Sequence, residues 1–319
     1  MIYLSNYDII YLGKKAEELG FVRDTLEKVT RLADTLEYLN TNPILKDSLA
    51  LKGGTAINLT IFNLPRLSID IDLDYLITNS REEMLESREV INDIIDRYMV
   101  SQGYSRNPKT KNPLSLDSWV YDYMGASGNK DNIKIEINYS LRSHVLDAEE
   151  RPIITNHFSS EYKVKTLAPL EIYGSKINAL LSRAAARDLY DARNMIHCGL
   201  FDESEEEMLR KCVVFYAAIS AKDKNNINKT FDTTAIDLIT NQKIKRELLP
   251  VIKRKDDFEL EAVKKLVKKY ISDLMVLTKE EKEFLDKFEG GEYIPELLFD
   301  DKEILDRIKN HPMALWKIR

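Results

Sequence analysis

Three aspartates at alternate positions make the segment from residue 66 to residue 76, RLSIDIDLDYL, the first candidate for chemistry. On a β-strand, Asp70, Asp72 and Asp74 would share one face, while the isoleucines and leucine between them pack into a core. Neighbouring aspartates would lie about 6.6 Å apart along the backbone. Such carboxylates suit Mg²⁺ or Mn²⁺, because both ions prefer oxygen ligands and because unneutralised carboxylates repel each other. The competing interpretation is the polar outer face of an edge strand.

A pair of glycines before this segment is the second candidate. The sequence LKGGT places Gly53, Gly54 and Thr55 between a short expected strand, SLALK, and an expected helix, AINLTIFNL. Glycines let backbone N–H groups approach an anion closely, and a helix N-terminus favours negative charge. The pattern therefore indicates a phosphate-binding turn with a hydroxyl beside it. The alternative is an ordinary tight turn.

A later alternating segment, NIKIEINYS at 132–140, could supply a third carboxylate. Lys134, Glu136 and Asn138 would share one face of a strand, and three isoleucines would occupy the other. If this strand pairs beside the aspartate strand, Glu136 can join Asp70 and Asp72. Taken alone, this segment favours a solvent-facing strand residue at Glu136.

The fourth candidate is a charged helical segment at 174–194, GSKINALLSRAAARDLYDARN. On one continuous helix, Lys176, Arg183 and Arg187 would lie on one side and form a cationic stripe suited to a polyphosphate. The three alanines between the arginines favour such a continuous helix. Asp188 and Asp191 are also neighbours on a helix. Each of these residues could instead form an ordinary surface ion pair.

The elements that must position these residues change in character along the chain. In the N-terminal part, helical periodicity at 14–40 and 81–102 accompanies strand patterns at 67–77, 118–125 and 132–140, the last two joined by a hairpin-type loop. After residue 165 the pattern is almost entirely helical, beginning with 169–198 as one long helix or two, and 204–220 with a capping box from Ser204 to Glu207. The sequence predicts an α+β fold with a mixed domain at 1–165 and a helical domain at 166–319 that completes the active-site cleft.

Composition narrows the class of protein. The 319 residues include 44% hydrophobic and 31% charged residues, which is typical of a soluble globular protein. The net charge of −6 gives no general reason to expect nucleic-acid binding. Residues 241–270, however, hold ten Lys and Arg against five Asp and Glu, so this stretch is a candidate anion-binding surface. A solvated helix face is the alternative.

Other classes of site are disfavoured by the sequence. Cys198 and Cys212 form no CxxC pattern, and the four histidines have no metal-ligand spacing. No apolar run approaches the roughly 20 residues of a membrane helix. The first residues lack the basic-then-apolar order of a signal peptide. We therefore expect a cytoplasmic protein with reduced thiols and no membrane partner.

The order of these motifs resembles that of polymerase-β-like nucleotidyltransferases, and specifically the AbiEii/AbiGii toxin family. The resemblance covers about residues 50–195 and depends on LKGGTAINL, RLSIDIDLDY, KIEINYS, EIYGSKINALLSR and ARDLYDARN. It implies a small mixed sheet followed by an α-helical domain. One departure is the AAA before RDLYD, where relatives often carry glycine or proline.

The resemblance also implies roles for individual residues. The catalytic residues would be Asp70, Asp72, Lys176 and Asp191, and the metal ligands Asp70, Asp72 and Glu136. Substrate would be bound by Gly53, Gly54, Thr55, Arg183, Arg187 and Asp188. Asp74 would be an accessory acid.

The function implied is that of a toxin in a bacterial toxin–antitoxin or phage-defence (abortive infection) system. Such an enzyme takes an NTP as donor and Mg²⁺ or Mn²⁺ as cofactor, uses two-metal catalysis, and has tRNA as its expected acceptor. A cognate antitoxin is the implied partner, with direct binding left open. The alternatives are a nucleotidyltransferase acting on a small molecule, or a non-catalytic module that binds a nucleotide or a partner. The intact aspartate pair and Lys176 argue against the non-catalytic module.

Overall fold

A computed structural model describes residues 7–113, 115–155, 157 and 161–319. The chain divides into two compact units. The first holds the described residues up to Arg142, together with Ala148–Leu167 and Pro250–Asp256. The second holds Ser143–Asp147, Ala168–Leu249 and Asp257–Arg319. Each unit therefore includes a short segment that lies, in the sequence, within the span of the other.

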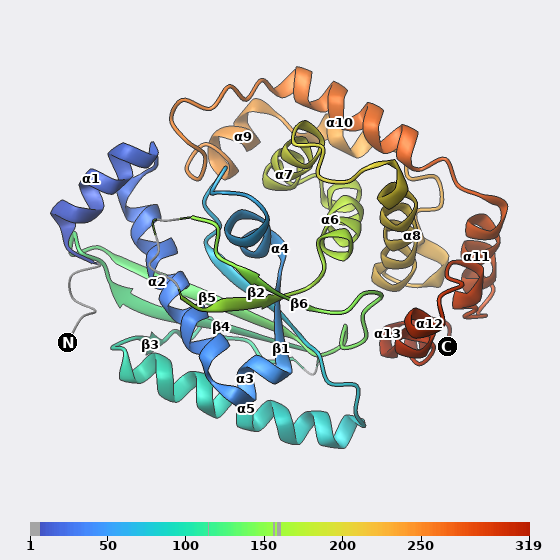
Figure 1. Cartoon of the computed structure of the whole chain (residues 1–319), viewed down its shortest axis with the longest axis horizontal. Coiled ribbons are helices and arrows are strands. Elements are labelled where there is room, and N and C mark those ends of the chain that lie inside the picture. The colour runs from blue at the N-terminus through green and yellow to red at the C-terminus, as the bar shows by residue number, and fades with distance from the viewer. Residues whose placement is uncertain (1–6, 114, 156, 158–160) are drawn as a thin grey trace. The chain divides into compact units, whose positions relative to one another are not determined.

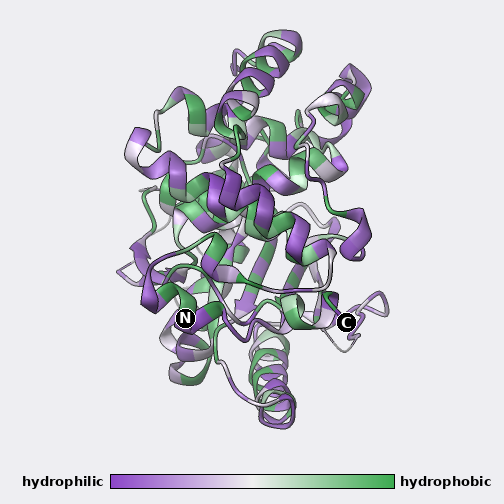
Figure 2. Ribbon diagram, turned by 90° about the vertical axis from the view of Figure 1, so that its right-hand side faces the viewer, coloured by the Kyte–Doolittle hydropathy of each residue, from purple (hydrophilic) through white to green (hydrophobic). Residues whose placement is uncertain are grey.

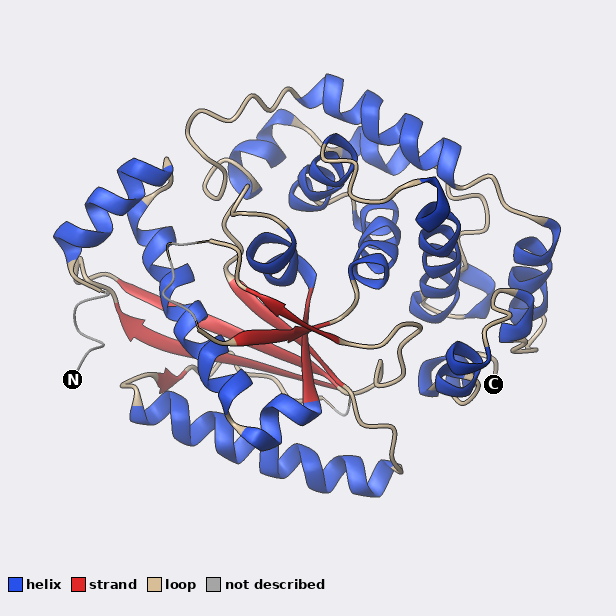
Figure 3. Ribbon diagram, in the orientation of Figure 1, coloured by secondary structure: helices blue, strands red, loops and turns tan. Residues whose placement is uncertain are grey.

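The first unit is built on a mixed sheet with the strand order β3-β4-β5-β2-β1-β7-β6 (Figures 1 and 3). Its central strand, β2, runs antiparallel to β1 and parallel to β5. The aspartates therefore do not lie on an edge strand, and that interpretation is wrong. The strands are β1 Leu49–Lys52, β2 Asp70–Tyr75, β3 Ser105–Arg106, β4 Leu116–Met124, β5 Lys130–Asn138, β6 Glu149–Pro152 and β7 Lys163–Thr166.

The helices of this unit differ from the prediction at three points. The expected helix at 14–40 is two helices, because Gly20 adopts a left-handed φ of 79° that ends the first of them. A short helix at 43–48 was not predicted, and the helix expected over AINLTIFNL already begins at Gly53 and ends at Ile61. The helices are α1 Ile9–Leu19, α2 Arg23–Thr41, α3 Pro43–Ser48, α4 Gly53–Ala56, continued by a π-helical turn at Ile57–Ile61, and α5 Arg81–Ser101, which lies where the helix at 81–102 was predicted.

Helices α2 and α5 cover the apolar face of the sheet. The rings of Tyr38 on α2 and Tyr98 on α5 are stacked with their centroids 3.8 Å apart. Arg88 on α5 donates to the buried carboxylate of Asp117 on β4 at 2.6 Å. Buried strand residues such as Ile135 fill the space between, at 0% exposure. The opposite face of the sheet is left to the polar residues of the same strands.

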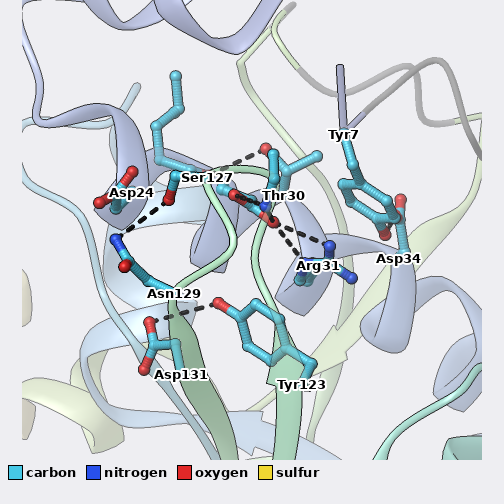
Figure 4. A network of polar contacts seen from close by, with 12 residues as sticks. Tyr7, Asp24, Thr30, Arg31, Asp34, Tyr123, Ser127, Asn129 and Asp131 are labelled. Atoms are coloured by element: carbon cyan, nitrogen blue, oxygen red, sulfur yellow. Dashed lines mark hydrogen bonds and ion pairs between the residues drawn. The ribbon is translucent and has the colours of Figure 1, made fainter. Parts of the chain in front are cut away.

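The hairpin between β4 and β5 is fastened to α2 by the network in Figure 4. The buried carboxylate of Glu27 accepts hydrogen bonds from the Ala126 backbone N–H at 3.0 Å and from the Arg31 guanidinium at 2.8 Å. Arg31 in turn lies over the rings of Tyr7 and Tyr123, at 3.9 Å and 4.4 Å from their centroids. These contacts hold β5, the strand of Glu136, at a fixed place on the helices.

The second unit consists of helices, and most carry an apolar side and a polar side, as the mixed colours of the ribbons in Figure 2 show. Helix α8 begins with a capping box formed by Asp202 and Glu205, so the predicted box at Ser204 and Glu207 is wrong by two residues. The helices are α6 Pro169–Arg183, α7 Ala186–His197, α8 Glu203–Ser220, α9 Asn241–Glu247, α10 Leu260–Leu274, α11 Lys279–Glu289, α12 Lys302–Ile308 and α13 Pro312–Lys317, with 3₁₀ turns at Lys224–Asn226, Thr234–Leu238 and Pro295–Leu297.

The segment Ser143–Asp147 is bound into this helical unit by its backbone. The carboxylate of Glu171, at 0% exposure, accepts hydrogen bonds from the Val145 N–H at 2.8 Å and the Leu146 N–H at 3.0 Å. It also accepts from the Tyr216 hydroxyl at 2.6 Å. Arg307 donates to the Val145 carbonyl oxygen at 2.9 Å. Within the described part of the chain, no helix is long and apolar enough to cross a membrane.

Candidate active site

The acidic pair lies on β2 beside a second polar strand. In the parallel pairing of β2 and β5, Asp70 is in register with Lys134, and Asp72 with Glu136. Register neighbours on adjacent strands lie about 4.8 Å apart and share a face of the sheet. The expectation that the Glu136 strand pairs beside the aspartate strand is confirmed, and it brings three carboxylates to one face.

The glycine turn lies against the second aspartate. Gly53 has a φ of +66°, a left-handed conformation that side chains other than glycine rarely adopt. A Cβ atom at Gly53 would lie 2.8 Å from the Oδ2 atom of Asp72. The backbone of the turn and the Asp72 carboxylate can be this close only because residue 53 has no side chain.

The second glycine lies against a buried arginine that sequence analysis did not select. A Cβ atom at Gly54 would be 2.6 Å from Nη2 of Arg66 and 2.9 Å from Oγ of Ser68. Arg66 is 2% exposed, and its Nη1 donates to the Leu67 carbonyl oxygen at 3.0 Å. Arg66 therefore supports the turn from inside the protein. Its position four residues before Asp70, in the RxSxD part of the motif, was the available signal.

Thr55 connects the turn to the acidic strand. Its side chain is fully buried, and its hydroxyl donates to the backbone carbonyl oxygen of Asp70. This bond fixes the start of α4 on β2. A phosphate contact by the Thr55 hydroxyl stays a prediction, and the bond to Asp70 gives this residue a positioning role in any case.

The charge around Asp72 is unfavourable for its ionised form. Burial raises the pKa of the Asp72 carboxyl, and the nearby carboxylates of Asp70 and Glu136 raise it further, against the opposing effect of Lys52 and Lys134. A bound cation would relieve this repulsion. The oxygen donors of Asp70 and Asp72 thus fit a hard divalent cation such as Mg²⁺ or Mn²⁺.

The other two acids of this face already have partners. The Asp74 carboxylate, 1% exposed, forms an ion pair with Lys52. The Glu136 Oε2 atom lies 2.7 Å from Nζ of Lys134. No group of three or more His, Cys, Asp and Glu side chains that could hold a metal ion occurs among the residues the structure describes. Asp70 and Asp72 therefore fit a cation as a pair, and Glu136 is engaged elsewhere.

The second unit holds the predicted lysine and its two aspartates in one buried cluster. Nζ of Lys176, on α6, lies 2.9 Å from Oδ1 of Asp188 and 2.9 Å from Oδ2 of Asp191, both on α7. The three side chains are 10%, 3% and 0% exposed. Burial raises the pKa of the Asp188 carboxyl, but Lys176 and Arg183 outweigh burial and lower this pKa to about 2.

Of the two alternatives left open for 169–198, one long helix or two, the structure has two helices. Helix α6 ends at Arg183, and Ala184 follows in a left-handed conformation with a φ of 49°. Lys243 on α9 donates to the Ala184 carbonyl oxygen at 2.6 Å and so caps the end of α6. The helix therefore ends at the three alanines, although these residues favour a continuous helix. Lys243, far away in the sequence, supplies the interaction that local propensity lacks.

The break also changes the predicted cationic stripe. Because Arg183 and Arg187 lie on different helices, they do not continue one side of α6 from Lys176. The Nε atom of Arg183 donates to Oδ2 of Asp188 at 2.8 Å, so Arg183 belongs to the Lys176 cluster by a different route. Arg187 is half-buried on α7.

Comparison with known proteins now identifies the family. The family model described as nucleotidyl transferase AbiEii toxin, type IV TA system, matches residues 35–292. That range includes the glycine turn, the acidic strand and the Lys176 cluster. The chain belongs to the AbiEii family of nucleotidyltransferase toxins.

A solved structure supports the fold of this AbiEii protein. The chain is similar to MenT4, a nucleotidyltransferase toxin from Mycobacterium tuberculosis H37Rv, with a TM-score of 0.64 and 17% sequence identity. The match covers 96% of this chain and 98% of MenT4. At this identity the likeness shows the fold, and the predicted α+β architecture of a polymerase-β-like nucleotidyltransferase is confirmed. No curated protein sequence matches the chain.

Proposed function

We propose that this AbiEii toxin transfers a nucleotide from an NTP to an RNA acceptor, with tRNA as the acceptor class, in a metal-dependent reaction. The observation that carries the proposal is the approach of Gly53 to Asp72, where a Cβ atom would lie 2.8 Å from the carboxylate. A glycine backbone touching a metal-type carboxylate is suited to a triphosphate, which needs both backbone N–H donors and a cation.

In this proposal an acceptor hydroxyl attacks the α-phosphorus of the NTP, a new P–O bond forms, and the bond to pyrophosphate breaks. Asp70 and Asp72 would hold the divalent cation, which when bound neutralises charge on the phosphate oxygens. Gly53 and Gly54 offer backbone N–H groups, and Thr55 keeps the turn on β2. The resemblance implies two metal ions for this chemistry. Whether a second ion binds depends on Glu136, whose carboxylate forms an ion pair with Lys134.

Lys176 serves the same reaction in this proposal, as part of its buried cluster. Its ammonium group is held by Asp188 and Asp191 at 2.9 Å each. A lysine held in this way keeps one orientation, and it can act on a triphosphate without losing side-chain entropy at the moment of binding. Arg183 and Arg187 are proposed to bind substrate beside it.

The basic stretch at 241–270 is the proposed RNA-binding surface, and the sequence alone selects Lys253, Arg254, Lys264 and Lys265 within it. Lys264 is 8% exposed and lies 3.0 Å from Glu261, and Lys268 lies 2.7 Å from Asp237, so neither offers a free charge to RNA. The exposed lysines of α9 and α10 are better candidates: Lys245, Lys265 and Lys269.

Reversing these charges tests the surface. Replacing Lys245, Lys265 and Lys269 by glutamate should weaken RNA binding and lower the slope of log K against log salt by about 2, because each lost contact to single-stranded RNA removes about 0.7. The same reversal at Lys279, Lys282 and Lys302 is the matched control, because these exposed lysines lie in residues 271–310, which hold six Lys and Arg against twelve Asp and Glu. Equal binding by both triple variants would remove this surface from the proposal.

The biological setting follows from the family. We propose that the protein acts in the cytoplasm, where NTPs and tRNA are available, and that it arrests growth unless a cognate antitoxin restrains it. Expression of the wild type without antitoxin should stop growth, and expression of Asp70→Asn should not.

The decisive experiment is transfer of label from each of the four α-³²P NTPs, with Mg²⁺, to total RNA, to total protein and to the enzyme itself. Label on small RNA with the wild type, and none with Asp70→Asn, is the expected result. Label on no macromolecule, with intact NTP binding, would overturn the RNA acceptor and favour a small-molecule acceptor or a module without catalysis.

A further inference from the structure

Two lysines stand on the same sheet face as the acidic residues of β2. Lys52 on β1 is in antiparallel register with Asp72, and Lys134 on β5 is in parallel register with Asp70. Each forms an ion pair, Lys52 with Asp74 and Lys134 with Glu136. The acids on either side of the Asp70–Asp72 pair are thus already neutralised by side chains of this chain.

The Lys134–Glu136 pair lies where a third metal ligand was expected. The two residues are two apart on β5, so their side chains share a face, and their charged atoms are 2.7 Å apart. Their side chains are 36% and 26% exposed, which leaves them open to ions and substrates. Glu136 is in register with Asp72, and a cation bound there would have to displace the Lys134 ammonium group.

We propose that Lys134 takes the place of a second metal ion beside Glu136, so that the face binds a single divalent cation through Asp70 and Asp72. This inference rests on the proposed function in one respect, that Asp70 and Asp72 bind the metal. It replaces the two-metal arrangement expected from the sequence. Lys134 is a positioning residue here, because it acts by occupying Glu136.

The test is Mn²⁺ binding to the full chain without nucleotide, followed by the loss of the EPR signal of free Mn²⁺. The wild type should bind one ion. Lys134→Met should bind two, because Glu136 is released to act as a ligand. The double variant Lys134→Met/Glu136→Gln should return to one ion. Lys130→Met, an exposed lysine at the start of the same strand, is the control and should bind one.

Each outcome bears on the proposal. Two ions on the wild type, or a tenfold or larger loss of Mn²⁺ affinity in Glu136→Gln alone, would make Glu136 a ligand and overturn it. One ion on Lys134→Met would also overturn it, since Lys134 would then block nothing. Loss of the single ion in Asp70→Asn supports the metal site of the proposed function. Persistence of the ion in that variant would contradict the proposed function itself, separately from the role of Lys134.

Discussion

Asp72 is the residue at which the local interactions of this site meet. Gly53, the first residue of α4, lies against it, Asp70 precedes it by two positions on β2, and Glu136 is its register neighbour on β5. Burial and two neighbouring carboxylates raise its pKa, while two lysines oppose the effect. A carboxylate with so many close neighbours tolerates little displacement, and the closest constraint on it is the missing side chain at residue 53.

Gly53→Ala should therefore damage catalysis more than stability. Alanine at a φ of +66° costs about 1–2 kcal/mol, and its Cβ would push against the Asp72 carboxylate. A displacement of this kind costs on the order of 100-fold in rate. Nucleotide transfer and urea unfolding would be measured together. Gly13→Ala on α1, with no heavy atom within 4 Å of its added Cβ, is the control and should keep full activity. Wild-type transfer by Gly53→Ala would contradict this account of the turn.

Asp188 makes a pH-dependent contribution to stability. Its pKa is about 2 in the folded protein against an ordinary 3.8. Because the folded pKa is the lower one, the stabilisation is present above about pH 4 and is lost as the pH falls toward 2. The difference corresponds to about 2 kcal/mol. The free energy of unfolding would be measured with urea at pH 5 and at pH 2.5. The wild type should exceed Asp188→Asn by more at pH 5 than at pH 2.5. A constant difference between the two proteins would contradict it.

At the scale of elements, sequence patterns predicted those helices and strands that local interactions determine. The alternation of Ile69, Asp70, Ile71 and Asp72 predicted a strand, and β2 is there. The end of α6 could not be predicted in this way, because three alanines favour a helix and the residue that caps the break, Lys243, is 59 positions beyond Ala184. Lys134 was seen as a strand residue, but its pairing with Glu136 depends on side-chain geometry that no pattern specifies.

The α6 cap gives a prediction about this element. Lys243→Met should lower the free energy of unfolding by about 1–3 kcal/mol, because the Ala184 carbonyl oxygen would lose a hydrogen bond from a charged donor. Nucleotide transfer should also fall, since the cap fixes the point at which α6, which carries Lys176, turns into α7, which carries Asp188. Gln242→Met, at an exposed position of the same short helix, should change neither. Equal stability of the two variants would show that the break does not depend on Lys243.

At the scale of the whole molecule, the order of the motifs was enough to predict the fold class. It was not enough to predict which of the two units each short segment belongs to. A change from mixed to helical pattern near residue 165 predicted two parts in sequence. Ser143–Asp147 nevertheless belongs with the helices, and Pro250–Asp256 with the sheet. Both segments lack periodicity of their own. Ser143–Asp147 is held by Glu171 and Arg307. Pro250–Asp256 is held by backbone hydrogen bonds, such as the one from the Leu67 N–H to the Val251 carbonyl oxygen at 2.7 Å. No sequence pattern matches these partners to the segments.

The contacts of Glu171 allow a test, with two fragments of the chain, of whether Ser143–Asp147 is part of the helical unit. Residues 143–319 keep the backbone donors of Val145 and Leu146, and residues 166–319 lack them. Because Glu171 is fully buried, the shorter fragment would hold a charge without those partners, and we expect it to be less stable by about 3 kcal/mol. Circular dichroism during urea unfolding measures the difference.

The substitution Glu171→Gln should act in opposite directions in the two fragments. In residues 143–319 it replaces one of the two acceptor oxygens by an NH2 donor, so either the Val145 N–H and the Tyr216 hydroxyl or the Leu146 N–H lose their acceptor, and stability should fall. In residues 166–319 it removes a buried charge that has lost two of those donors, so stability should rise. The same sign in both fragments would mean that Ser143–Asp147 contributes little to the helical unit. Opposite signs would establish that the segment after β5 is part of the fold of the helices.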